Sequence, residues 1–179
     1  MSGPDRAGEA PQRGAPDTET LDADARLRDA WTWSHRQAAL LRLVDRADAA
    51  GAPEVDWSGV IAEIEAVGVA ELNATRSLLR QAMALLLQIR GWPENADRPA
   101  WLIAVGGVLA DLAIHLTPGM RPYLDLKHLY QLARSQLAGV ALDGQLPRPF
   151  PSGCPFSLDD LLRADRAQLD TLLVPNEEL

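Results

Sequence analysis

The stretch Trp101-Leu-Ile-Ala-Val-Gly-Gly-Val-Leu-Ala-Asp-Leu-Ala-Ile-His-Leu116 decides the expected fold. Its side chains are apolar around almost the whole circumference of a helix, which is typical of a helix at the centre of a domain. A membrane span needs about 20 apolar residues, whereas this stretch is shorter and contains Asp111 and His115. We therefore predict an all-α fold, a single compact bundle of about five helices around this central apolar helix. The side chains expected at its centre are Trp101, Val105, Val108, Leu109 and Leu112.

The other four helices are expected on both sides of this stretch, because apolar residues recur there at helical spacing and no segment alternates like a strand. They are predicted over residues 27–51, over residues 56–90, between the turn at 117–119 and Gly139, and from Ser157 onward. The second helix would extend roughly 50 Å, and Gly68 within it is a candidate for a bend or for a close helix crossing. Ser157 and Asp160 resemble a capping box at the start of the last helix.

Apolar side chains define the expected inner faces of the first two helices. On the first helix they are Trp33, Leu40, Leu41 and Val44, and on the second Trp57, Val60, Ile61, Ile64 and Val67. Spacings of three and four residues place such side chains on one side of a helix. We expect both faces to be buried.

The first 26 residues are expected to form a mobile tail. They contain several prolines and glycines but almost no large apolar side chain, so burial cannot offset the entropy lost when they become ordered. The predicted organisation is therefore a disordered tail over residues 1–26 and one helical domain over residues 27–175. The loop over residues 147–155 should be ordered despite its prolines, because Phe150 and Phe156 can anchor it.

Charge and cysteine usage limit the partners and the location. The 179 residues carry 17 basic and 25 acidic side chains, which gives a net charge of −8. Such a field repels phosphate backbones, so we expect no nucleic-acid partner. A single cysteine cannot form an internal disulfide, which fits a reducing cytosol. The N-terminus lacks the apolar core of a signal peptide, so we predict a cytoplasmic protein without a membrane partner.

Four titratable side chains are the candidates for catalysis: Glu63, Glu65, Asp111 and His115. Glu63 and Glu65 are separated by about 200° around a helix, so they cannot hold one metal ion together. For Glu63 the structural alternative is a salt bridge to an arginine of another helix. Asp111 and His115 are four residues apart, a spacing that suits metal ligation or a carboxylate that orients a histidine. The structural alternative there is an internal hydrogen bond.

No other motif indicates a particular chemistry. The sequence lacks a phosphate-binding glycine loop, a paired-cysteine metal motif, and the signatures of zinc proteases and nucleophile elbows, so we predict no cofactor and no metal ion. Cys154 has neither Lys nor His beside it in the sequence. We interpret it as a small buried residue that anchors the last loop, with a reactive thiol as the alternative.

Several landmarks occur in a fixed order along the chain. They are Trp31, the run Gln37 to Arg42, Asp56-Trp57, Glu63-Ile-Glu65 with Gly68, Trp101, and Phe150-Pro-Ser-Gly-Cys-Pro-Phe-Ser-Leu-Asp-Asp-Leu-Leu162. In this order and at these spacings they resemble the bacterial family called domain of unknown function 29. The resemblance covers about residues 28 to 165 and implies no known activity.

One departure from that family bears on function. Its members commonly carry His-Leu-Leu-Lys-Trp near the end of the second helix, where this sequence has Leu85-Leu-Leu-Gln-Ile89. The third helix is arginine-rich in the family and mostly apolar here, between Val105 and Leu112. If the family's polar groups build an active site, this chain has lost much of it. If they join helices, apolar packing has replaced ion pairs.

The sequence leaves two classes of function open. A non-catalytic module that binds another protein or itself through an apolar face agrees with the hydrophobic third helix and the absent motifs. A hydrolytic or metal-dependent enzyme would instead need Glu63 or Glu65, Asp111 and His115 to converge in a site between helices. The sequence favours the interaction module.

Overall fold

The computed structural model describes residues 26, 28–47 and 55–163 of the 179-residue chain. In chain order the elements are α2 (Ala30–Ala47), α3 (Trp57–Gly91), α4 (Arg98–His115), the 3-10 helix η1 (Pro118–Tyr123), α5 (Leu126–Leu137) and α6 (Leu158–Arg163). Leu142 and Gln145 form an isolated antiparallel bridge. Within the described ranges there is no strand, so the predicted all-α class is confirmed.

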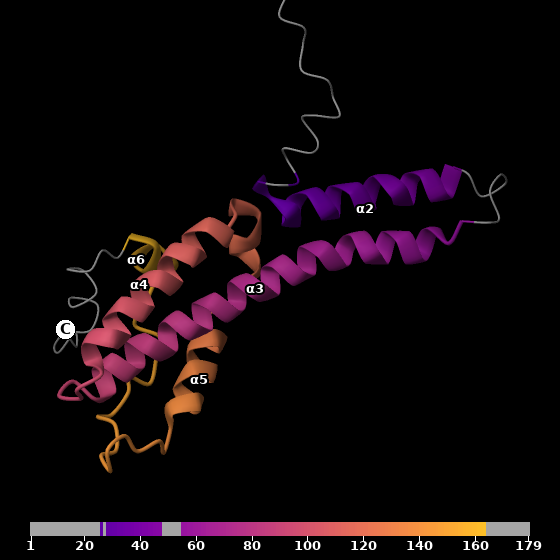
Figure 1. Ribbon diagram of the computed structural model, residues 1–179. Coiled ribbons are helices and arrows are strands. Elements are labelled where there is room, and N and C mark those ends of the chain that lie inside the picture. The colour runs from indigo at the N-terminus through magenta and orange to yellow at the C-terminus, as the bar shows by residue number, and fades with distance from the viewer. Residues whose placement is uncertain (1–25, 27, 48–54, 164–179) are drawn as a thin grey trace, which may run out of the picture.

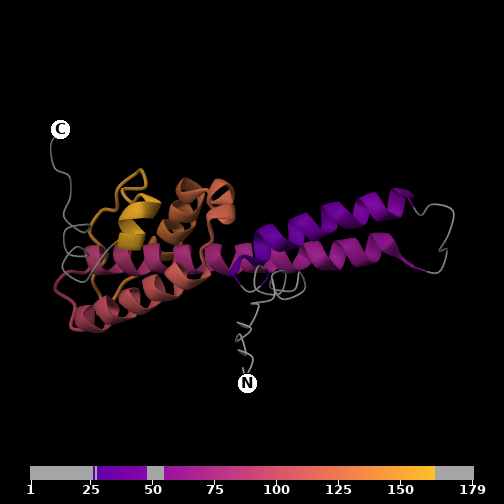
Figure 2. The same cartoon turned by 90° about the horizontal axis from the view of Figure 1, so that it is seen from above.

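The long helix α3 organises the described chain (Figure 1). It contains 35 residues, which corresponds to roughly 50 Å at 1.5 Å per residue. α2 packs beside the N-terminal part of α3, and α4 and α5 pack beside its C-terminal part. Seen from above, α2 and the start of α3 project from the other helices (Figure 2). We term α2 together with residues 57–72 the arm, and residues 73–163 the body.

α4 is not the central helix that the sequence predicted. Its buried side chains, on the side that packs against α3, are Val105, Val108, Leu109 and Leu112. On the opposite side Ile103 and Ile114 are 67% and 78% exposed. Four of the five side chains predicted for the core are therefore buried, and Trp101 is half-buried. The prediction that the helix is enclosed on every side is wrong, because an apolar helix can also carry an apolar outer side and periodicity does not separate the two cases. Nor does any described helix, α4 included, reach the length and hydropathy of a membrane-spanning segment.

The core of the body is built on the C-terminal part of α3. Its residues come from α3, α4, α5, α6 and the segment that leads into α6. The largest fully buried ones include Leu79, Met83, Leu86, Leu87, Leu112, Tyr130 and Leu161. Three residues of the run 85–89, in which the sequence departs from the family pattern, belong to this core. In this chain that run is therefore structural.

The arm is held together by a close crossing of α2 and α3 at Gly68. Trp31, Ser34 and Ala38 form the buried side of α2, and a Cβ atom on Gly68 would collide with Oγ of Ser34. α3 continues through Gly68 as one helix, so this glycine marks a close crossing. Ser34 Oγ and His35 Nδ1 both donate to the carbonyl of Trp31, at 3.0 and 2.9 Å, which satisfies these polar groups within α2.

The apolar side chains expected on the inner face of α2 lie mostly on its outer side. Leu40 and Val44 are 46% and 45% exposed, and Trp33 and Leu41 are half-buried. The predicted inner face of α2 is therefore wrong. Ser34 and Ala38 are buried instead, and their small size allows the two helix backbones to approach closely. The third buried side chain, Trp31, packs with Leu72 and Met120.

On α3, Ile61 is buried as predicted, but Val60 is 41% exposed, so that part of the prediction is wrong. Trp57, Ile64 and Val67 are half-buried.

Side-chain caps fix the starts of the helices. At α3 the carboxylate of Asp56 accepts from the backbone N–H of Gly59 at 2.9 Å. The predicted capping box at α6 is confirmed, since Asp160 N donates to Ser157 Oγ and Ser157 N donates to Asp160 Oδ2, both at 3.1 Å. A hydrogen bond from Ser58 lowers the pKa of Asp56, and hydrogen bonds from Ser157 lower the pKa of Asp160, relative to the usual 3.8.

The loop before α6 is anchored on the body through its two phenylalanines. Phe150 packs edge-on against Trp92, and Phe156 packs edge-on against Tyr130, each with ring centroids 6.4 Å apart. The Tyr130 hydroxyl donates to the carbonyl of Pro151 at 2.8 Å. Burial raises the pKa of Tyr130, which keeps this donor protonated.

Some predictions concern residues outside the described ranges. The mobile tail predicted over residues 1–26 falls there, apart from Arg26. So do Leu169 and Leu172, in the later part of the predicted last helix, and the domain boundary predicted at residue 175.

We expect Gly68→Ala to destabilise the protein, although alanine is the better helix former. The added methyl group collides with Ser34, and overpacking of this kind costs typically about 1–3 kcal/mol, against a gain of ~1 kcal/mol from helix propensity. The matched control is Gly106→Ala in α4, where a Cβ atom meets nothing within 4 Å, and it should stabilise. Urea denaturation followed by circular dichroism measures both. Equal effects of the two substitutions would contradict the close crossing.

The capped carboxylates predict a loss of stability in acid. A carboxyl group whose pKa is lowered on folding stabilises the folded state above its unfolded pKa, and this contribution is lost as the pH falls through the folded value. For Asp56 and Asp160 the loss begins below about pH 4. NMR titration should place both midpoints below 3.8. Asp56→Asn keeps an acceptor that does not titrate. The difference in free energy of unfolding between wild type and this variant should therefore become smaller as the pH falls. A difference that stays constant with pH would argue against the cap.

Candidate functional site

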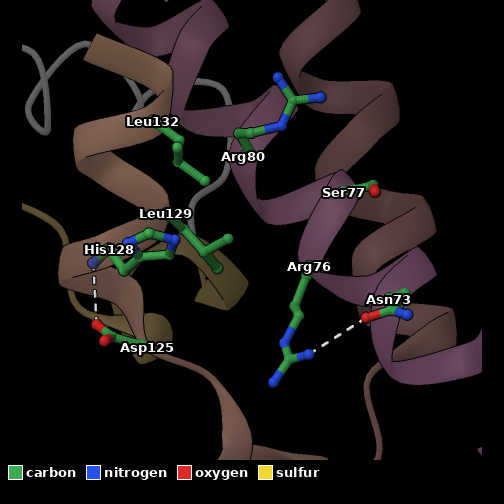
Figure 3. Close-up of a pocket in the computed structure, with 8 residues that line it drawn as sticks. All are labelled: Asn73, Arg76, Ser77, Arg80, Asp125, His128, Leu129 and Leu132. Atoms are coloured by element: carbon green, nitrogen blue, oxygen red, sulfur yellow. Dashed lines mark hydrogen bonds between the residues drawn. The ribbon is translucent and has the colours of Figure 1, made fainter. Parts of the chain in front are cut away.

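A cleft of about 540 Å³ lies between α3 and α5 (Figure 3). The residues that line it are Asn73, Arg76, Ser77 and Arg80 on α3, and Asp125, His128, Leu129 and Leu132 at the start of α5. Leu129 is buried and Leu132 is 44% exposed. The cleft therefore combines an apolar side with two arginines and a histidine.

The local sequence explains why these side chains meet. Residues 73, 76, 77 and 80 are spaced by three and four and share one side of α3. Asp125 caps α5 by accepting from the backbone N–H of His128 at 2.9 Å. Leu129 turns inward with the buried side of α5, which leaves His128 and Leu132 at the edge beside α3 (Figure 3).

Both arginines of the cleft are held by neutral acceptors. Arg76 donates to the carbonyl of Tyr123 at 2.9 Å and to the side-chain oxygen of the asparagine one turn earlier at 3.2 Å. Arg80 donates to Oε1 of Gln136 on α5 at 2.7 Å. Of the described residues that line the cleft, Asp125 is the acidic one. The two guanidinium groups point to opposite ends of the cleft, Arg76 toward Tyr123 and Arg80 toward Gln136, so each joins α3 to a different part of the chain around α5 (Figure 3).

The two glutamate candidates lie in the arm, away from this cleft. Glu65 forms a 2.8 Å salt bridge with Arg42 of α2, so the helix-packing salt bridge expected for Glu63 forms at Glu65. Glu63 is exposed and precedes Asn73 by roughly 15 Å along α3. Partly exposed ion pairs such as Arg42–Glu65 contribute about 0–1 kcal/mol.

The two candidates of α4 lie at the opposite side of α3. Nδ1 of His115 is 3.7 Å from Oε2 of Glu71 on α3, and both side chains are more than a third exposed. Asp111, one turn earlier on α4, is exposed. The contact of His115 is therefore with a glutamate that the sequence analysis had not considered.

The four candidates do not meet in one place. Glu63 and Glu71 are separated by roughly 12 Å along α3, so Glu63 and His115 stand at different levels of the helix. Within the described residues there is no group of three or more His, Cys, Asp or Glu side chains that could hold a metal ion. Two of the four candidates meet a charged side chain of another helix, Glu65 meeting Arg42 and His115 meeting Glu71.

Cys154 is half-buried in the loop before α6. Its thiol donates to the carbonyl of Phe156 at 3.4 Å, and its side chain packs against the core of the body. Burial raises the pKa of the Cys154 thiol, and the hydrogen bond opposes this to a smaller extent. These surroundings are those of a structural cysteine, because a reactive one needs a lowered pKa.

A second surface lies on the outer side of α4. Ile103, Gly107, Ala110 and Ile114 follow one another at spacings of four, three and four residues, so they share one side of the helix. All four are exposed. We term this stripe the α4 outer face. Apolar surface of this kind on a folded protein marks interaction sites.

The model of the family described as Domain of unknown function DUF29 matches residues 27–166. The chain belongs to this family. The resemblance read from the landmarks between residues 28 and 165 is thereby confirmed. The description of DUF29 assigns no activity to its members.

A solved structure similar to this DUF29 protein is that of an α-helical protein of unknown function from Rhodospirillum rubrum. The two sequences are 27% identical, and the TM-score is 0.71. The alignment covers 83% of this chain and 94% of the other. No curated protein matches the sequence significantly.

The residues of the cleft were not among the candidates predicted from the sequence. Arg76 and Arg80 give one local signal of a tertiary role. Two like charges four residues apart weaken an isolated helix, so such a pair indicates contacts outside the helix. The sequence around His128 gives no such signal, because His128 reaches the cleft only through the packing of α5 against α3.

We expect Cys154 to react slowly with a thiol reagent in the folded protein. Its raised pKa lowers the thiolate fraction near neutral pH, and the thiolate is the reacting species. Reaction with an aromatic disulfide reagent at pH 8 should be slower than in the urea-unfolded chain, which is the control. A folded-state rate equal to or above the unfolded-state rate would restore the reactive-thiol interpretation.

Proposed function

We propose that this DUF29 protein is a non-catalytic interaction module, and that the α4 outer face docks a second copy of the chain. The observation that carries the proposal is the high exposure of Ile103 and Ile114 on a helix whose other side is firmly buried. Exposed isoleucines gain free energy when a partner covers them. The separation of Glu63, Glu65 and His115 over the arm and the body supports the non-catalytic part.

Small residues between the two isoleucines give the α4 outer face a shape that suits a helix. A Cβ atom added at Gly106 or Gly107 would meet nothing within 4 Å, so the described chain leaves this space open. A partner helix can approach the backbone of α4 closely there, with an isoleucine at each end of the contact.

The α4 outer face is also self-complementary. Along the helix its side chains are large, small, small and large, at spacings of four, three and four residues. This sequence of sizes and spacings reads the same in both directions. In an antiparallel contact across a two-fold axis, Ile103 of each copy faces Ile114 of the other, and Gly107 faces Ala110. A two-fold interface requires a surface that matches itself in this way.

The apolar area limits the affinity. Burying an exposed isoleucine contributes roughly 1.5–3 kcal/mol, and the two-fold contact buries four, or roughly 6–12 kcal/mol in all. Association costs about 4–15 kcal/mol in lost freedom. Because the two terms are of similar size, we expect a reversible dimer of modest affinity.

Charge supports a protein as the partner in place of nucleic acid. The net charge of −8 repels phosphate backbones. The four residues of the α4 outer face are uncharged, so a second copy can approach them without bringing like charges into direct contact.

The first test of the proposal is Ile114→Arg, which should make the protein monomeric. The substitution places a charge in the contact, while the exposure of Ile114 lets the arginine reach water in the monomer. Sedimentation velocity from about 1 µM to about 1 mM covers the expected range of affinity. The control is Leu146→Arg, at an equally apolar side chain that is 69% exposed in a loop, and it should leave the dimer unchanged. A wild-type protein that stays monomeric throughout would refute self-docking.

A mixing experiment tests the antiparallel geometry. Ile103→Lys and Ile114→Glu should each weaken the dimer when measured alone. In an equimolar mixture the introduced lysine faces the introduced glutamate, and the remaining isoleucines face each other, so dimers should return. A mixture as weak as its components would place the contact elsewhere. Circular dichroism controls for folding.

A further inference from the structure

We infer that one face of the arm is a docking site for an amphipathic helix of another protein. Its apolar side chains come from both helices of the arm: Leu40, Leu41 and Val44 on α2, and Val60, Ile64 and Val67 on α3. We term this surface the arm apolar face. It shares no residue with the α4 outer face, so the inference does not depend on self-docking.

The apolar side chains of α2 and α3 lie on the same face of the arm. Arg42 and Glu65 form a 2.8 Å salt bridge, and each follows a buried residue of its own helix, at positions 38 and 61, by four residues. Leu41 and Ile64 follow the same buried positions by three residues. Four residues turn a helix about 40° past a full turn, whereas three stop about 60° short of it. The salt bridge therefore marks one face of the arm, and Leu41 and Ile64 lie on the opposite face.

The arm apolar face is open to solvent in the described chain. Leu40, Val44 and Val60 are between 41% and 46% exposed, and the other three side chains are half-buried. A helix normally buries its apolar stripe against another element. In the arm two helices leave part of their stripes uncovered, and a partner that covers them gains free energy by burial.

In the body a single helix covers the same side of α3. Glu71 follows Val67 by four residues and so lies on that side. Its Oε2 is 3.7 Å from Nδ1 of His115, the last residue of α4. α4 thus ends where α2 begins (Figure 1). A helix on the arm apolar face, between α2 and α3, would continue the layer that α4 forms in the body.

Opposite charges border the two edges of the arm apolar face. Arg36 and Glu63 are exposed, and each is two residues from a buried residue of its own helix. Two residues are about 200° around a helix, so both side chains lie at the outer edges of the arm. Arg36 is four residues before Leu40, and Glu63 is four residues before Val67, which places them beside the face. The α2 edge is therefore basic and the α3 edge acidic.

These edges specify the chemistry of the partner. A helix with acidic side chains along one edge of its apolar stripe and basic side chains along the other matches both edges of the arm apolar face. An anionic membrane or a nucleic acid would instead require basic residues on both edges. The charges therefore favour a protein helix as the occupant.

The test uses the full chain and a synthetic helix of about 18 residues, roughly 27 Å long. This mixed probe has a leucine stripe with glutamates along one edge and lysines along the other. Two comparison probes have the same stripe with glutamates only or with lysines only. Titrations followed by ¹⁵N NMR should show saturable shifts in α2 and the first turns of α3, and the mixed probe should bind most tightly. No saturable binding, shifts centred on the α4 outer face, or tighter binding of a single-sign probe would overturn the inference.

Two valines of α3 offer a matched pair of variants. Val60→Glu places a carboxylate on the arm apolar face and should weaken binding of the mixed probe about tenfold or more. The control is Val69→Glu, which should leave binding unchanged. Val69 is 45% exposed but comes two residues after Val67, about 200° around the helix. Equal effects of the two substitutions would show that the probe binds elsewhere.

Arg36→Glu tests the basic edge. It makes both edges of the arm apolar face acidic, so the lysine-only probe should now bind more tightly than the mixed probe. Loss of folding cannot produce this reversal, because it would weaken both probes. An unchanged order of the probes would contradict the assignment of the edges.

Two further measurements distinguish other occupants. If Ile114→Arg still dimerises in sedimentation velocity and an added Val60→Glu abolishes the dimer, a second copy covers the arm apolar face and the inference is wrong. It is equally wrong if the chain binds vesicles of phosphatidylcholine and phosphatidylglycerol and Val60→Glu abolishes that binding. An Ile114→Arg chain that is monomeric, binds the mixed probe and ignores vesicles would support the inference, whether or not the wild type self-associates.

Discussion

The continuity of α3 is the constraint on which the rest of the structure depends. Its 35 residues pass through both the arm and the body, so α2, α4 and α5 each pack against the same helix at different places (Figure 1). In the arm, Gly68 allows α2 to approach, because any side chain there would push Ser34 away. In the body, fully buried side chains such as Leu79 and Leu86 fill the contact. One helix thus makes a close contact at a glycine in the arm and a contact through large apolar side chains in the body.

A helix of this length also leaves its partners open to solvent. α2 covers one part of α3, and α4 and α5 cover another, so none of the three is enclosed on all sides (Figure 2). Each keeps an outer side. On α4 that side is apolar and contains Ile103 and Ile114, and on α5 one edge borders the arginines of the cleft. An elongated arrangement exposes more surface than a compact bundle of the same size. The outer face of α4 proposed for self-docking follows from this geometry.

Sequence patterns predicted the helices better than their surroundings. The start of α3 could be predicted because the cap at Asp56 depends on residues three positions apart. The inner face of α2 could not, since Leu40 and Val44 have the spacing of a buried face while smaller side chains make the contact. Which side of a helix is buried depends on the helix beside it, and that information is not local. The same holds for the cleft, where Arg76 and His128 come from separate helices and meet only because α5 returns to α3.

In residues 85–89 this chain lacks the charged and titratable side chains that the resemblance to the family implies. The resemblance to the family places His and Lys at the positions of Leu85 and Gln88, which are half-buried here; the other three positions are buried in the core. A histidine and a lysine there would need partners from neighbouring helices. Apolar packing can replace such pairs without loss of stability, and Leu85 packs against the core. The replacement nevertheless removes two titratable groups from α3. α3 keeps cations on both sides of this run: Arg76 and Arg80 line the cleft before it, and Arg90 follows it, where its charge acts on Tyr130 of α5. The departure from the family pattern therefore changes how α3 packs against its neighbours and leaves these arginines in place.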